Sequence, residues 1–203
     1  MARFVVMLLL LAGTASAGPA PAAVAFNEPF GWPTGSSVAG SLYLGLTARQ
    51  VLRINVASYE DLAGGLGDGI SEFEGGDGAE RDGHTTDVGV GWLAFPRAAY
   101  DGPMFEAGAL YRHRDLSVTD YDAVNVYDAI NSDEVAARAL VGWSWLFDRH
   151  VFVALAVGVS AGYEFGIETT QGCPDQDPTQ MTTPVHRWTV GAETYLRFGA
   201  VLR

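Results

Sequence analysis

The stretch VFVALAVGVSAGYEFGIE, residues 151–168, shows the pattern that decides the fold. Bulky apolar residues such as Val157 and Ile167 occupy every second position, and the positions between them are mostly small or acidic, as at Gly158 and Glu164. Strict alternation is the period of a β-strand, whose successive side chains point to opposite faces. The stretch exceeds an ordinary globular strand and suits a tilted strand that crosses a bilayer, which needs about 9 to 11 residues.

The same alternation recurs along the chain. It is clear at residues 134–147 and 188–202, and weaker at residues 38–47, 51–59, 86–95 and 105–116. Seven strands result. Because small single-chain bacterial barrels have an even number of strands, we expect residues 22–30 to supply the eighth. The predicted fold is all-β: a closed, antiparallel, up-and-down transmembrane β-barrel of about eight strands.

The two faces of these strands separate a membrane barrel from a soluble one. A soluble ligand-carrying barrel would bear charge outside and apolar residues inside. Here the non-bulky face is rich in glycine, such as Gly142 and Gly191. Glycine covers a solvated surface poorly but fits the narrow interior of an eight-stranded barrel. The bulky face is therefore predicted to face lipid, where an Arg at Val157 would disrupt insertion and an Ala at Gly158 would be mild.

A few charged residues lie on the face predicted to be internal. Because buried charges need partners, we expect them to form a network inside the lumen. Arg138 and Glu164, on neighbouring strands, are expected to interact diagonally within it. The predicted members are Arg53, Glu106, Arg112, Arg114, Arg138, Glu164, Glu193 and Arg197.

The N-terminus has the pattern of an export signal. Arg3 precedes an apolar run at residues 4–12 and the small residues of an A-x-A motif at residues 15–17. We therefore expect residues 1–17 to be a cleavable signal peptide and residues 18–203 to be the barrel domain. No uncharged apolar stretch after the signal reaches the roughly 18 residues that a spanning helix requires. Cys173 is the one cysteine of the chain, so no disulfide framework is expected.

The net charge and the lengths of the predicted loops also bear on function and on orientation. The chain has a formal charge of −12, and loss of Arg3 with the signal makes it −13, so binding to nucleic acid is not expected. The predicted connections at residues 48–50, 96–102 and 148–150 are short, whereas those at 59–83, 118–133 and 169–184 are long. In barrels of this kind short turns face the periplasm and long loops face outward.

On this architecture and alternation, the chain after the signal resembles the eight-stranded OmpA/OmpX/OmpW-type outer-membrane proteins. In the last strand, Thr189, Gly191 and Leu196 are similar to the polar, glycine and hydrophobic positions of the assembly signal of outer-membrane proteins. The resemblance implies a place in the outer membrane of a Gram-negative bacterium. It also implies insertion by the barrel assembly machinery and contact with outer-membrane lipids and lipopolysaccharide.

Neither a catalytic centre nor a cofactor is expected. Barrel enzymes that deacylate lipid A carry a His with a Ser two residues later on one strand, and no such pair occurs at His84, His113, His150 or His186. The loop at residues 60–83 is dense in carboxylates. Its weak candidates for a Ca²⁺ site are Asp68, Glu72, Glu74 and Asp77, although their spacing departs from an EF-hand loop.

The leading hypothesis is a non-enzymatic integral outer-membrane protein that supports envelope integrity or surface interaction through its acidic outer loops. Eight strands leave an interior just filled by side chains, which disfavours a general porin. A narrow channel for small or apolar solutes is one alternative, and a lipid A-modifying barrel enzyme is another. The sequence names no ligand and gives no oligomeric state.

Overall fold

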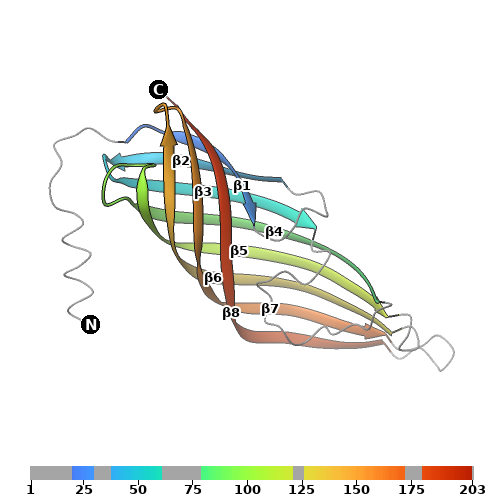
Figure 1. The fold of residues 1–203 in the computed structure, drawn as a ribbon. Helices are drawn as coiled ribbons and strands as arrows, with labels where there is room; N and C mark the ends of the chain where they lie inside the picture. The colour runs from blue at the N-terminus through green and yellow to red at the C-terminus, as the bar shows by residue number, and fades with distance from the viewer. Residues whose placement is uncertain (1–19, 30–37, 61–78, 121–125, 172–179, 203) are drawn as a thin grey trace, which may run out of the picture.

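A computed structural model of the chain describes residues 20–29, 38–60, 79–120, 126–171 and 180–202. These residues form eight strands (Figure 1). The strands are β1 (Ala23–Pro29), β2 (Val38–Thr47), β3 (Gln50–Glu60), β4 (Ala79–Ala94), β5 (Gly102–Asp120), β6 (Val126–Phe147), β7 (Val151–Gln171) and β8 (Gln180–Val201). None of the described residues forms a helix long and apolar enough to cross a membrane.

The eight strands close into a barrel. Each strand pairs antiparallel with its neighbours in sequence, and β1 joins the ring to β8. In that closing pair Ala23 lies opposite Val201 and Phe26 lies opposite Phe198. The prediction of an all-β, closed, antiparallel barrel with the first strand at residues 22–30 is therefore confirmed.

The two ends of the barrel differ. At one end, which we call the turn end, short connections join β2 to β3, β4 to β5 and β6 to β7 (Figure 1). Asp148 and Arg149 make the turn between β6 and β7 with φ of 48° and 62°. These left-handed values match the twist of a tight hairpin. The opposite end, where β3 is followed by β4, β5 by β6 and β7 by β8, is the loop end.

Strands β4 to β8 extend farther toward the loop end than predicted. The segments 59–83, 118–133 and 169–184, predicted as loops, contain strand residues, since β4 begins at Ala79, β6 at Val126 and β8 at Gln180. Those predicted boundaries were wrong. Near the loop end both faces are polar, as Asn131 outside and Ser132 inside illustrate. Successive side chains still point to opposite faces there, but apolar and polar residues no longer alternate along the strand.

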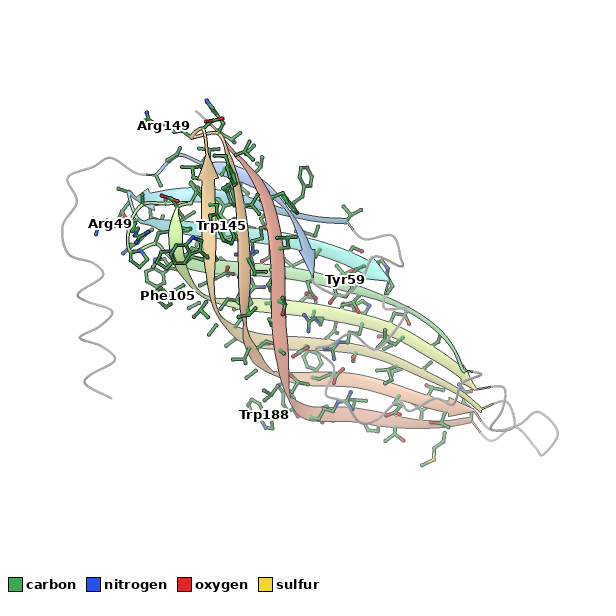
Figure 2. The ribbon with its side chains drawn as sticks, viewed as in Figure 1. Arg49, Tyr59, Phe105, Trp145, Arg149 and Trp188 are labelled. Atoms are coloured by element: carbon green, nitrogen blue, oxygen red, sulfur yellow. The ribbon has the colours of Figure 1, made fainter. Side chains whose placement is uncertain are left out.

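Along the middle of the strands, bulky apolar side chains face outward and small, polar or charged side chains face inward. On β7, Val157 and Val159 are 48% and 55% exposed, whereas Ala156 and Ser160 are 0% and 3% exposed. Figure 2 shows the labelled Trp188 projecting outside the strands, and Arg49 and Arg149 at the turn end. The predicted assignment of the two faces agrees with this arrangement.

An aromatic plug fills the lumen at the turn end. Its buried rings are Tyr43, Phe95, Tyr100 and Phe152. Tyr100 stacks on Phe152 with ring centroids 5.0 Å apart, and Tyr43 meets both rings edge-on. The Tyr100 hydroxyl donates to the carbonyl oxygen of Pro21 at 2.8 Å, and the Ser144 hydroxyl donates to the carbonyl oxygen of Tyr100 at 2.7 Å. These bonds hold the β4–β5 turn across the barrel mouth.

Candidate functional site

Beyond the aromatic plug, ionised side chains fill the lumen toward the loop end. They come from every strand from β3 to β8. Among the described residues the lumen ion pairs involve Arg53, Arg112, Arg114, Arg138, Arg187 and Arg197, with Asp87, Glu106, Glu134, Glu164 and Glu193. Six arginines against five carboxylates leave a net charge of +1, so the lumen as a whole is nearly neutral.

The group nearest the aromatic plug is the basic cluster, which consists of Arg53, Arg138 and Arg197 around Glu106. Their guanidinium nitrogens lie 2.9, 3.2 and 2.8 Å from the Glu106 carboxylate oxygens. All three guanidinium groups also lie over the ring of Tyr195, 5.1 to 5.9 Å from its centroid. The aromatic face therefore adds cation–π attraction to the ion pairs.

The next group is the mixed cluster, in which Arg112 meets three carboxylates. Arg112 binds Asp87 with two parallel hydrogen bonds, of 2.8 and 3.0 Å, and lies 3.5 Å from Glu193 and 3.7 Å from Glu134. The two-bond geometry matches a planar guanidinium to a planar carboxylate. The Tyr195 hydroxyl donates to Glu193 and accepts a bond from Arg138, and so connects the mixed cluster to the basic cluster.

The outer cluster surrounds Glu164. Arg187 donates to Glu164 at 2.6 Å, Arg114 at 3.2 Å and the Ser132 hydroxyl at 2.6 Å. Arg114 also pairs with Glu134 at 3.0 Å, which links the outer and mixed clusters. Each of the five lumen carboxylates thus has a cationic partner, as buried carboxylates require.

All eight residues predicted for the lumen network face inward, and each takes part in at least one ion pair. The structure separates Arg138 from Glu164, however, because Arg138 lies opposite Ser160 and Glu164 lies opposite Glu134 in the β6–β7 register. Arg138 meets Glu106 instead. The two charges belong to different clusters.

Sequence reasoning missed three members of the network: Asp87, Glu134 and Arg187. Each sits close to the loop-end limit of its predicted strand, where hydropathy stops alternating. Counting residues along each strand could have found them, because residues an even number of positions apart point to the same face of the sheet. Glu134 is an even number of residues from Arg138, and Arg187 is an even number from Glu193, so each pair shares a face.

The outer face carries two polar contacts near the loop end. The Ser58 hydroxyl lies 2.7 Å from His84 Nε2, and His113 Nδ1 lies 2.9 Å from the Asp133 carboxylate, to which Tyr111 also donates. Ser58 and His84 come from β3 and β4. They therefore do not match the sequence pattern of a His followed by a Ser two residues later on one strand.

An esterase centre around Ser58 would need more than the contact with His84. A serine nucleophile needs free N–H donors to stabilise an oxyanion. Ser58 lies in the middle of a sheet, opposite Val38 on β2 and Thr86 on β4, so the nearby backbone N–H groups are used in the strand ladders. The described residues at this place therefore show a hydrogen bond between two neighbouring strands on the outer face.

The structure says nothing about the candidate calcium ligands. Asp68, Glu72, Glu74 and Asp77, and also Cys173, lie outside the described residues. Within the described ranges no group of three or more His, Cys, Asp or Glu side chains could hold a metal ion.

Comparison with known proteins gives a distant structural likeness. No family model matches the chain, and no curated protein matches it. The crystal structure of a major outer membrane protein from Thermus thermophilus is similar to the chain with a TM-score of 0.49 and 11% identity. The match covers 89% of this chain and 99% of that one.

Proposed function

We propose that the protein is a non-enzymatic integral outer-membrane β-barrel whose loop end faces outward and supports envelope integrity or surface interaction. The observation that carries the proposal is the inverted polarity of the barrel. Large apolar side chains such as Val141 and Val157 are about half exposed outside, while Arg53 and Arg197 are fully buried inside. In water this arrangement would expose a continuous apolar belt. In a bilayer the belt meets lipid, and the closed sheet satisfies the backbone.

The apolar belt has the height of a bilayer core. On β6 the outward residues from Val135 to Trp145 are apolar, and Asp133 is the first polar one beyond them. Eleven residues are separated by ten steps of about 3.3 Å, which at a tilt of about 40° span about 25 Å, the height of the band on outer-membrane barrels. Aromatic residues border the belt: Trp143, Trp145 and Phe147 toward the turn end, and Tyr111, Tyr163 and Trp188 toward the loop end.

The orientation follows from the connections. Short turns of outer-membrane barrels face the periplasm, which puts Arg49, Arg97 and Arg149 on the periplasmic side. The loop end, where β3 ends at Glu60 and β4 begins at Ala79, then faces the cell exterior, and the sequence between these two residues is acidic. An acidic surface next to anionic lipopolysaccharide favours divalent cations as bridges, so the partners that we propose are lipopolysaccharide and outer-membrane lipids.

Membrane fractionation followed by gel electrophoresis tests the proposal. The protein is expected in the outer-membrane fraction, extractable by detergent, and folded barrel is expected to migrate differently before and after boiling. The matched control is a sample unfolded in urea before loading, which should show the boiled mobility in both lanes. Recovery in the aqueous fraction with one mobility would overturn the membrane assignment.

A lipid A-modifying enzyme is the second candidate, and the Ser58–His84 contact is the observation that favours it. Overexpression in cells, with mass spectrometry of lipid A, tests it. The enzyme candidate requires an acyl pattern that changes with the wild-type protein and not with Ser58→Ala. We expect the same pattern with both.

A further inference from the structure

The apolar belt is much shorter on β3 than on β7. On β3 the outward residues Leu52 to Val56 are apolar, and the polar residues Gln50 and Ser58 follow at the two ends. On β7 every outward residue from Val151 to Ile167 is apolar or aromatic. At about 3.3 Å a residue and a tilt of about 40°, the two polar residues of β3 are about 20 Å apart in height, whereas the apolar run of β7 extends for about 40 Å.

A row of polar side chains crosses the outer face from β3 to β6. Ser58 lies opposite Thr86 on β4. His113 on β5 lies opposite Thr86 and also opposite Asp133 on β6. On β7 the same row continues with the apolar Phe165. Asp133 is the first polar residue beyond the belt on β6, so its level serves as the loop-end boundary of the belt.

The strand register shows that such a row slopes relative to the membrane. A path from partner to partner starts at Phe198 on β8, passes through Phe26 on β1 and Val135 on β6, and returns to β8 at Trp188. Trp188 is ten residues nearer the loop end than Phe198. Ten residues of about 3.3 Å against eight strand spacings of about 4.8 Å correspond to a strand tilt of about 40°. From β6 back to β3, a row therefore approaches the turn end by about 3 Å with each strand.

This slope places the polar row of β3 and β4 below the boundary. Ser58 is three strands away from Asp133 and lies about 9 Å nearer the turn end, and Thr86 lies about 6 Å nearer. On the opposite wall of the barrel, Ile167 lies about 8 Å beyond the boundary and is 51% exposed. The loop-end edge of the apolar surface is therefore uneven, low at β3 and high at β7.

The turn-end edge of the apolar surface is level. Gln50 on β3 and Val151 on β7 both lie about 30 Å from the boundary. A tilt of the whole barrel would raise Ser58 only by raising Gln50 into the hydrocarbon. The short belt of β3 is therefore a difference in height between the two walls and does not reflect a slanted barrel.

We propose that the barrel thins the loop-end leaflet of the bilayer beside β3 and β4, where lipid headgroups descend to the polar row. A flat hydrocarbon surface at the level of Asp133 would cover Ser58 and Thr86, and burial of polar groups in hydrocarbon is unfavourable. Bilayers adapt to a short apolar surface by thinning beside it. Headgroups and their water supply both donors and acceptors to the row. The inference rests on the proposed place of the barrel in a membrane.

The depth of nitroxide labels tests the proposal. Val56 on β3 and Val159 on β7 face outward and lie at nearly the same height, about 14 and 12 Å below the boundary. The protein carrying Val56→Cys or Val159→Cys, each with Cys173→Ser, is labelled and folded into dioleoylphosphatidylcholine vesicles. The accessibility of each label to oxygen and to a nickel chelate reports its depth. A leaflet thinned to the level of Ser58 puts the label at Val56 about 7 Å shallower than the label at Val159.

Two further variants show whether the polar row is the cause. Ser58→Val combined with Thr86→Val extends the apolar surface and should move the label at Val56 to the depth of the label at Val159. Asn131→Val replaces a polar outward residue beyond the boundary and is the matched control, which should leave the depth unchanged. The comparison of the two labels without these variants stands even if the double variant does not fold.

Equal depths of the two labels would overturn the proposal, and so would a label at Val56 that stays shallow in the double variant. If both labels report water, the proposed place in the membrane fails and the inference fails with it. Equal depths within hydrocarbon would instead leave the membrane assignment intact and reject the thinning alone.

Discussion

At the residue scale, the lumen depends on properties that are particular to arginine. Arg53 alone contacts three acceptors, since its Nη2 reaches both Glu106 and Asn55 and its Nη1 lies 3.5 Å from the Ser41 hydroxyl. A guanidinium has five donors in a planar fork, whereas a lysine ammonium is a compact point charge. The basic residues of the chain, histidines aside, are all arginine. One side chain can therefore connect several strands across a narrow interior.

The arrangement of the basic cluster predicts unequal effects of its members. Glu106→Gln leaves three buried cations without a counter-charge and should destabilise the barrel by about 3 to 5 kcal/mol. Arg138→Met leaves Glu106 paired with Arg53 and Arg197, so its loss should be smaller, about 1 to 3 kcal/mol. Urea unfolding measures both. An equal or larger loss for Arg138→Met would contradict this account of the cluster.

The separate clusters predict which charges are energetically coupled. A double-mutant cycle on Arg114 and Glu164, which lie 3.2 Å apart, should give a coupling of about 0.5 to 3 kcal/mol. The same cycle on Arg138 and Glu164 should be additive within about 0.5 kcal/mol, because each has its own partners. Strong coupling of Arg138 with Glu164 would mean that the clusters rearrange as one unit.

At the element scale, β7 shows how alternation assigns the two faces. Val157 lies opposite Val141 on β6 and Thr194 on β8, and all three face outward. Gly158 faces inward, yet it is not a site of mild substitution as predicted. An added Cβ would lie 2.0 Å from the carbonyl oxygen of Ala139 and 2.8 Å from the Cα of Leu140. The backbone of β6 therefore approaches β7 too closely for any side chain at this position.

A charge on the outer face of β7 should prevent insertion. Val157→Arg is expected to destabilise the inserted barrel by about 2 to 4 kcal/mol, since an Arg would lie at the midplane of the bilayer. Val157→Leu keeps the apolar character and is the matched control in place of Gly158→Ala. The measurement is the fraction of heat-modifiable protein in the outer membrane. Equal fractions for the two variants would contradict the assignment of the lipid face.

Sequence patterns predicted the strands of the apolar belt well because each residue there has one environment, lipid or lumen. Alternation predicted seven strands, the even strand number of small bacterial barrels added the eighth, and parity predicted that Arg138 and Glu164 face inward. Which charges meet does not follow from parity. The pairing of Arg53 with Glu106 depends on the register of β3 with β4 and of β4 with β5, and on side chains that reach across the lumen from β8.

At the scale of the whole molecule, three kinds of packing occupy the lumen in series. The aromatic plug closes the turn end, the basic cluster follows, and the mixed and outer clusters continue toward the loop end. Each layer joins strands that are distant in the chain, such as Arg53 on β3 and Arg197 on β8, both bound to Glu106 on β5. The layers therefore brace the cross-section of the barrel and occlude it at the same time.

Because successive layers of side chains block the lumen, we predict that the barrel conducts no ions. Wild-type protein reconstituted in a planar bilayer should add no steady ion current to the bare bilayer, because buried side chains of the aromatic plug and of the basic cluster lie across the lumen. Tyr100→Ala removes the ring that stacks on Phe152 and opens the turn end. It should still add no current, since the basic and mixed clusters remain.

A large porin in the same apparatus supplies the positive control, and gel mobility confirms that the variant is folded. Steady current from the wild type would instead favour the narrow-channel alternative. Current from Tyr100→Ala alone would mean that hydrated ions pass the charged layers and that the aromatic plug is the barrier.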